Sequence, residues 1–142
     1  MGCVRYGMAK NGSGILIVED EPLVALGMSV SLEQAGFRVV GVVSSATAAI
    51  ESVSRLRPGM VLMDITLRGP TDGIEAARLL QEHFGVPVLF VTGQADMATK
   101  ARAMAATRGC GYILKPFSGE QLTEAVSRAI DPGAWPEPGS VQ

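Results

Sequence analysis

Residues Met60–Asp64 read MVLMD, four apolar residues followed by one acid, and this stretch decides the fold class. An apolar run this short has no polar face, so it predicts a strand that is buried on both sides of a sheet. Such strands are typical of parallel sheets that are covered by helices on both faces. The stretch therefore indicates an α/β protein in which Asp64 stands where a central strand ends.

Similar runs lie on both sides of this stretch, and each is followed by a segment whose apolar residues have helical spacing. The expected strands are Ile15–Val18, Val39–Val43, Met60–Met63, Val86–Val91 and Gly111–Leu114, and the expected helices are Leu23–Ala35, Ala46–Arg55, Ile74–His83, Asp96–Arg108 and Glu120–Ile130. Gly36 is expected to end the first helix, and Ser118 with Gln121 predicts a capping box before the last. Five strand–helix units predict a doubly wound five-stranded parallel sheet with helices on both faces.

The flanking segments differ from this pattern. Residues 1–13 carry three glycines and no apolar period, which predicts a disordered leader. Residues 131–142 hold three prolines and two glycines and predict a loose tail, which includes Trp135. We therefore expect one domain over residues 14–130 that acts as a stand-alone protein, and the sequence leaves open whether it belongs to a longer regulator.

Composition excludes several classes of protein. Hydrophobic residues make up 47% and charged residues 18% of the chain, as in a compact domain. The net charge of −2 gives no reason to expect direct contact with nucleic acid or with an anionic membrane. No apolar run reaches the roughly 18–20 residues that span a bilayer. Cys3 and Cys110 are expected to be reduced thiols in a cytoplasmic protein, and with His83 they form no cluster spaced for zinc.

Polar side chains follow four of the five predicted strands. The first strand is followed by Glu19, Asp20 and Glu21, and the third, fourth and fifth by Asp64, Thr92 and Lys115. In an open parallel sheet, ligands bind outside the carboxyl ends of the strands. We therefore expect these groups to converge on one small site.

The composition of that site has a chemical meaning. Clustered carboxylates repel one another and raise each other's pKa unless a cation lies among them. Oxygen ligands of this kind suit Mg²⁺, while a lysine and a threonine hydroxyl suit phosphoryl oxygens. A carboxylate such as that of Asp64 can itself be phosphorylated. Each of these residue types, taken alone, is more often found in a loop, a helix cap or the surface. The hypothesis of a metal and phosphoryl site therefore depends on the presence of complementary polar groups at four strand ends.

Four motifs resemble the receiver domain of bacterial response regulators, the CheY-like family of two-component signalling, over residues 14–130. They are ILIVEDEP at Ile15–Pro22, VLMDITL at Val61–Leu67, PVLFVTG at Pro87–Gly93 and GYILKPF at Gly111–Phe117. The resemblance implies the flavodoxin-like strand order 2-1-3-4-5. It also implies a cis peptide between Lys115 and Pro116.

The resemblance further implies the role of each site residue. Asp64 would be the phosphoacceptor, assisted by Lys115 and Thr92, and Thr92 and Tyr112 would form the conformational switch. Mg²⁺ would be held by Glu19, Asp20, Asp64 and the backbone carbonyl of Thr66. The donor would be a sensor histidine kinase or a histidine phosphotransfer protein, and a downstream protein would dock on the face formed by helix four, strand five and helix five.

Under this interpretation the chain is a signalling switch that catalyses only its own phosphoryl transfer and slow dephosphorylation. The sequence does not identify the kinase, the target, the oligomeric state or the dephosphorylation rate. It also departs from the common family pattern after the third strand. Arg68 stands where many members have proline, Pro70 lies six residues past Asp64 and Gly73 nine past it, so this loop is one residue longer.

Three alternatives remain. An aspartyl-nucleophile phosphatase of the haloacid dehalogenase type needs a second acid two residues after the nucleophile, where this chain has Thr66. A flavodoxin-like nucleotide binder needs a phosphate-binding loop after the first strand, where this chain has three acids. A degenerate receiver would keep the fold and act only as a protein-interaction module, against which Asp20, Asp64, Thr92 and Lys115 argue.

Overall fold

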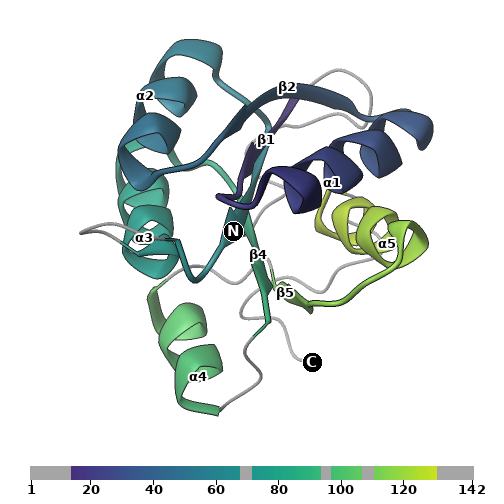
Figure 1. The fold of residues 1–142 in the computed structure, drawn as a ribbon. Coiled ribbons are helices and arrows are strands. Elements are labelled where there is room, and N and C mark those ends of the chain that lie inside the picture. The colour runs from purple at the N-terminus through teal and green to yellow at the C-terminus, as the bar shows by residue number, and fades with distance from the viewer. Residues whose placement is uncertain (1–13, 68–71, 94–96, 107–110, 131–142) are drawn as a thin grey trace.

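The computed structural model describes residues 14–67, 72–93, 97–106 and 111–130, in which strands and helices alternate (Figure 1). The strands are β1 (Gly14–Val18), β2 (Arg38–Val43), β3 (Met60–Asp64), β4 (Val88–Thr92) and β5 (Tyr112–Leu114). The helices are α1 (Pro22–Gln34), α2 (Ala46–Leu56), α3 (Gly73–Phe84), α4 (Met97–Ala106) and α5 (Gly119–Ile130). Among the described residues, no helix has both the length and the apolar character needed to cross a membrane.

The five strands form one parallel sheet in the order β2-β1-β3-β4-β5, which confirms the predicted fold and strand order. Strand β3 lies at the centre, with Met60 beside Ile15 of β1 and Met63 beside Phe90 of β4. All carboxyl ends therefore point to the same edge of the sheet. The strand ends that carry the predicted site residues are brought together by this arrangement.

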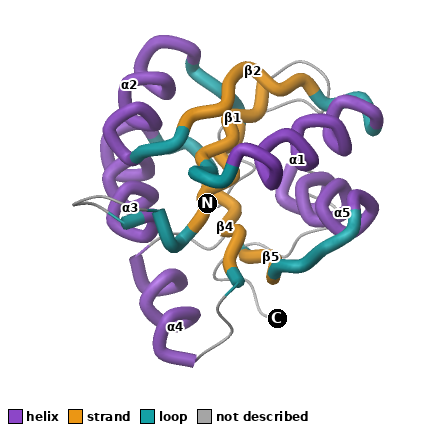
Figure 2. The backbone as a smooth tube through the Cα atoms, viewed as in Figure 1, coloured by secondary structure: helices purple, strands orange, loops and turns teal. Residues whose placement is uncertain are grey.

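Helices cover both faces of the sheet (Figure 2). Helices α1 and α5 contact each other on one face, where Leu32 and Leu122 pack on Ile17 and Leu62. Helices α2 and α3 cover the other face and pack on the alternate strand residues, and α4 contacts α3. Because the side chains of a strand alternate between faces, each of the three central strands contributes to both cores.

The central and edge strands differ in burial. Every residue of β1, β3 and β4 is buried, as predicted for strands covered on both faces. The same prediction was wrong for Val39–Val43, because β2 lies at the edge of the sheet and Val42 is 48% exposed. Strand β5, at the other edge, has no fully buried residue.

Local signals in the sequence set the helix ends. Ser45 caps α2, Asp72 caps α3, and Ser118 and Gln121 exchange hydrogen bonds of 2.8 and 3.0 Å before α5, which confirms the predicted capping box. Gly36 adopts a φ of 96° after α1, which confirms the predicted helix stop. The predicted leader and tail, with Trp135, and also Cys110, lie outside the described residues.

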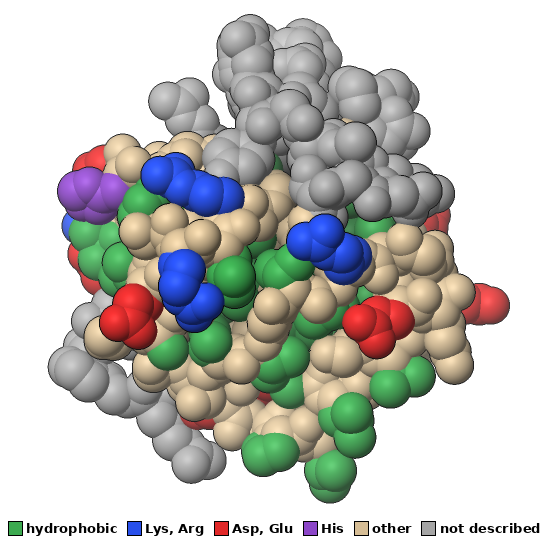
Figure 3. Space-filling model, turned by 90° about the horizontal axis from the view of Figure 1, so that it is seen from above, with side chains coloured by type: hydrophobic (Ala, Val, Ile, Leu, Met, Phe, Trp, Pro, Cys, Tyr) green, Lys and Arg blue, Asp and Glu red, His purple; other side chains and the backbone are tan. Residues whose placement is uncertain are grey.

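Helix α1 keeps apolar side chains on its outer surface. Leu23, Leu26 and Val30 are 81%, 59% and 45% exposed, and their spacing places them on one side of the helix. Figure 3 shows hydrophobic side chains of this kind exposed among polar ones on one face of the molecule. The apolar pattern of α1 therefore extends beyond what the core requires.

Candidate functional site

The carboxyl ends of β1 and β3 bring three acids together. Glu19, Asp20 and Asp64 each offer a carboxylate oxygen within 4.8 Å of the others. Glu19 and Asp64 are buried, and Asp20 is partly exposed beside a hollow of about 380 Å³ that Glu19, Pro22 and Ser44 also line. Acids that the sequence separates by more than 40 residues thus meet at one point, as predicted.

The carboxylate of Asp64 is held in a fixed orientation. Its side chain is 2% exposed, and its Oδ1 accepts hydrogen bonds of 3.0 Å from both the backbone N–H and the hydroxyl of Thr66. Two bonds from one neighbour restrict rotation of the carboxylate about its last torsion. Thr66 therefore positions the Asp64 carboxylate, a role that sequence reasoning did not assign to it.

Lys115 follows β5 and contacts the acids, and its peptide bond to Pro116 is cis, as the resemblance implied. Its Nζ lies 3.1 Å from Oε1 of Glu19, 3.7 Å from Oδ2 of Asp64 and 3.8 Å from Oε1 of Glu21. Burial alone would lower the pKa of the Lys115 amine, but Glu19 and Asp64 outweigh it and raise the pKa above its usual value. Lys115 is therefore a fixed positive charge at neutral pH.

Glu19 is held through both of its carboxylate oxygens. Its Oε2 accepts a hydrogen bond of 3.2 Å from the backbone N–H of Glu21, while its buried Oε1 is paired with Nζ of Lys115 at 3.1 Å. Burial, reinforced by the negative charge of Asp64, raises the pKa of the Glu19 carboxyl above its usual value, although Lys115 opposes this. One lysine thus leaves the buried acids short of positive charge.

These features fit a divalent cation of the magnesium type. The donor set is entirely oxygen, as Mg²⁺ prefers, and the buried carboxylates of Glu19 and Asp64 share the one charge of Lys115. A cation among the three acids would also offset the repulsion that raises the pKa of Glu19. Glu19, Asp20 and Asp64 are therefore compatible with a Mg²⁺ site.

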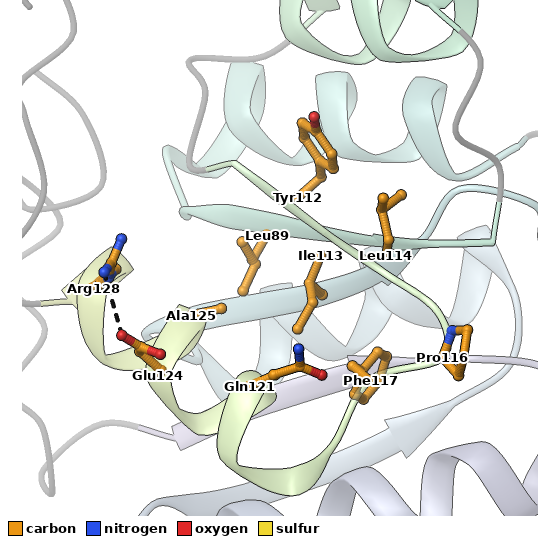
Figure 4. A pocket seen from close by; sticks show the side chains of 10 residues that line it. All are labelled: Leu89, Tyr112, Ile113, Leu114, Pro116, Phe117, Gln121, Glu124, Ala125 and Arg128. Carbon is orange, nitrogen blue, oxygen red and sulfur yellow. Dashed lines mark hydrogen bonds and ion pairs between the residues drawn. The ribbon is translucent and has the colours of Figure 1, made fainter.

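The two predicted switch residues occupy contrasting environments. Thr92 ends β4 and is 1% exposed, whereas Tyr112 begins the edge strand β5 and is 37% exposed. Figure 4 shows Tyr112 and Leu114 pointing away from α5, while Ile113 points toward it. An open groove of about 620 Å³ lies between β5 and α5, lined mainly by Tyr112, Ile113, Leu114, Phe117 and Ala125.

The start of α3 touches the backbone of Asp64. The N–H of Gly73 donates a hydrogen bond of 3.1 Å to the carbonyl of Ile65. A Cβ on Gly73 would lie only 2.0 Å from the carbonyl oxygen of Asp64, so this position requires glycine. The loop before it, with Arg68 and Pro70, lies outside the described residues.

Asp72 is a second residue near the site that sequence reasoning missed. Its Oδ1 caps α3 by accepting a 2.9 Å hydrogen bond from the N–H of Glu75, and its Oδ2 lies 2.5 Å from Nη2 of Arg102 in α4. The sequence carried a signal for the first contact, because an aspartate three residues before a glutamate is typical of a helix start. It carried none for the second, which joins residues 30 positions apart.

Comparison with known proteins identifies the family. A model of the response regulator receiver domain matches residues 15–127. The chain is 36% identical over 124 residues to the phyllosphere-induced regulator PhyR of Methylorubrum extorquens, covering 86% of this chain and 45% of PhyR. It is 30% identical over 118 residues to the transcriptional regulatory protein PdtaR of Mycobacterium tuberculosis, covering 82% of this chain and 56% of PdtaR.

Solved structures agree with these relatives. The signal receiver domain of a modulated diguanylate cyclase from Desulfovibrio desulfuricans G20 superposes with a TM-score of 0.76 at 36% identity, covering 83% of this chain and 93% of that one. The chain spans about half the length of the curated relatives it matches. The match over residues 15–127, together with the strand order, shows that the chain belongs to the response regulator receiver domain family of two-component signalling.

Proposed function

We propose that this chain is a phosphoacceptor receiver, which takes a phosphoryl group onto Asp64 from the histidine of a sensor kinase or a histidine phosphotransfer protein. The observation that carries the proposal is the meeting of Glu19, Asp20, Asp64 and Lys115 at one edge of the sheet. Members of the family act as signalling switches rather than as dedicated enzymes. The only reactions of this chain would be its own phosphorylation and slow dephosphorylation.

The transfer requires an aligned carboxylate and stabilisation of negative charge. A carboxylate oxygen of Asp64 forms the new bond to phosphorus while the bond between phosphorus and the donor histidine nitrogen breaks. Thr66 holds the carboxylate in orientation through its two hydrogen bonds. Lys115, already 3.7 Å from Asp64, places a positive charge where the phosphoryl oxygens arrive.

Glu19, Asp20, Asp64 and the carbonyl of Thr66 would hold Mg²⁺. When bound, the ion supplies positive charge that offsets the charge of the incoming phosphoryl group. The meeting of Glu19, Asp20 and Asp64 within 4.8 Å, with Glu19 and Asp64 buried, supports this assignment. The assignment predicts that Asp20→Ala greatly weakens Mg²⁺ binding in a titration, and an unchanged titration would count against the site.

Thr92 and Tyr112 would convert phosphorylation into a change of surface. The hydroxyl of Thr92 would move toward the phosphoryl oxygens, and Tyr112 would turn inward from its exposed position. Phosphorylation would thereby favour one of two existing states of the face formed by α4, β5 and α5. A downstream protein would dock there, next to the groove between β5 and α5.

The setting of the chain follows from the same proposal. We place residues 14–130 in the cytoplasm as one receiver domain, in keeping with donors that are cytoplasmic parts of two-component systems and with only two cysteines. Relatives such as MtrA are DNA-binding response regulators. The net charge of −2 gives this chain itself no basis for direct contact with nucleic acid.

Intact-mass spectrometry after incubation with acetyl phosphate and Mg²⁺ tests the proposal. We expect one added phosphoryl group, no addition when Mg²⁺ is chelated, and no addition to Asp64→Asn. Circular dichroism of the variant should match that of the unchanged chain. Failure of the folded protein to gain mass with any donor would favour a receiver that acts only as an interaction module.

A further inference from the structure

The ion pair between Arg102 and Asp72 joins two helices that flank the site. Arg102 belongs to α4, and its Nη2 lies 2.5 Å from Oδ2 of Asp72, the residue that caps α3. By contrast, Arg78 and Arg128 form their ion pairs with acids three or four residues away on their own helices. The Arg102 pair can therefore transmit a displacement between elements, which the other two cannot.

Asp72 uses both carboxylate oxygens at this junction. One oxygen accepts the N–H of Glu75 and the other pairs with Arg102. Burial would raise the pKa of the Asp72 carboxyl, but the Glu75 bond and Arg102 outweigh it and lower the pKa. The carboxylate is thus charged at neutral pH, and the start of α3 is held from within its own helix and from α4.

The next residue transmits this restraint to the site. Gly73 donates to the carbonyl of Ile65 at 3.1 Å, and its Cα lies so close to Asp64 that a Cβ would meet the carbonyl oxygen. The Asp72 carboxylate accepts the N–H of Glu75 and so is tied to the first turn of α3, which means that its displacement by Arg102 moves this turn and the contact of Gly73 with the Asp64–Ile65 backbone. The path from α4 to the phosphoacceptor backbone is therefore one ion pair, the capped first turn of α3 and one hydrogen bond.

We propose that Arg102 is a positioning residue for the phosphoacceptor: through Asp72 it fixes the start of α3 against the Asp64–Ile65 backbone and couples the position of α4 to the site. This route is separate from that through Thr92 and Tyr112. Its effect on phosphorylation rests on the proposed function, whereas its effect on the backbone does not.

The first test is hydrogen exchange by NMR on the unphosphorylated 142-residue chain without Mg²⁺. Arg102→Gln should accelerate exchange of the Gly73 amide by roughly two- to fivefold, the range expected of a partly exposed ion pair. Asp72→Asn should do the same, because asparagine still caps a helix but carries no charge. Arg102→Lys should retain most of the protection.

Arg128→Gln is the matched control, since Arg128 and Arg102 have similarly exposed side chains, 55% and 57%. It should leave the Gly73 amide unchanged. In the double variant Asp72→Asn/Arg102→Gln, the second change should add nothing to the first, because both remove the same pair. Unchanged exchange in both single variants, additive effects, or an equal effect of Arg128→Gln would overturn the proposal.

The second test measures phosphorylation of Asp64 by acetyl phosphate. Arg102→Gln should lower the maximal rate by roughly two- to fivefold and leave the half-saturating acetyl phosphate concentration unchanged, since Arg102 does not touch the donor. A change in exchange without a change in rate would refute coupling to the site. If the unchanged protein takes up no phosphoryl group, the proposed function fails, and the exchange result still decides the structural link.

Discussion

Strand β3 ends in a charged residue of the site, Asp64, and strand β5 is followed by another, Lys115, but the two residues lie in different surroundings. Strand β3 lies at the centre of the sheet with all five residues buried, and its Asp64 is 2% exposed. Strand β5 has three residues at the edge, none fully buried, and the side chain of Lys115, which follows it, is 20% exposed. The difference teaches that the site joins a buried half, which carries the proposed acceptor Asp64, to a more exposed half at the surface where partners would dock.

The largest effect is expected from replacing one leucine in each strand with alanine. Leu62→Ala in β3 should lower the free energy of unfolding by about 2–5 kcal/mol, because it leaves a cavity in a fully buried position. Leu114→Ala in β5 should cost less than about 1 kcal/mol, because that side chain is 38% exposed. Urea denaturation measures both, and similar losses would break the comparison.

A smaller effect is expected from replacing Lys115, which follows β5. Lys115→Ala should slow phosphorylation of Asp64 by acetyl phosphate roughly 10²- to 10³-fold, because Lys115 is the cationic side chain that the described residues place beside Asp64 to offset the developing charge. Lys115→Arg keeps the charge and should retain part of the rate. A rate for Lys115→Ala within a few-fold of the unchanged protein would show that the edge half contributes little to the chemistry.

The packing of α3 against β3 gives a prediction with an internal control of opposite sign. Gly73→Ala should destabilise the fold by about 1–3 kcal/mol, because its Cβ meets the Asp64 backbone, which cannot yield easily. Gly27→Ala in α1 should stabilise the fold by about 0.5–1 kcal/mol, since a Cβ there meets nothing within 4 Å. Chemical denaturation separates the two, and a tolerated Gly73→Ala would mean that β3 is less rigid than its burial indicates.

The smallest effect concerns Glu19, the buried acid that follows β1. The pKa of Glu19 is raised by burial and by Asp64, so the unfolded chain releases this proton at lower pH than the folded one. The contribution of Glu19 to the free energy of unfolding therefore falls as the pH rises from the ordinary pKa of glutamate through the higher pKa that Glu19 has in the folded chain. In chelator at neutral pH, Glu19→Gln should raise the midpoint of thermal unfolding by a few degrees.

The gain in melting temperature from Glu19→Gln should vanish near about pH 4, where Glu19 is largely protonated in both the folded and the unfolded chain. Added Mg²⁺ should reverse the order of the two proteins, because the glutamine binds the ion poorly. Equal melting temperatures at neutral pH would show that Lys115 already balances the buried charge.

The sequence predicted the elements that depend on local pattern. Neighbouring residues determine the central strands, the helix stop at Gly36 and the capping box of Ser118 and Gln121. The convergence of Glu19, Asp64 and Lys115 follows from the parallel arrangement of the strands. The exposure of β2 could not be predicted, because an apolar strand at the edge of a sheet can have the same sequence pattern as one at its centre. The pair of Arg102 with Asp72 depends on how α4 packs on α3, which no local pattern encodes.

The contact of Gly73 with Asp64 also bears on how this chain can evolve. A position whose Cβ would overlap backbone atoms disfavours every residue other than glycine, whatever its distance from the chemistry. In a saturation mutagenesis screen scored on signalling, we expect position 73 to tolerate as few substitutions as Asp64 does. A residue without a side chain would then be indistinguishable, by mutational tolerance, from the proposed phosphoacceptor.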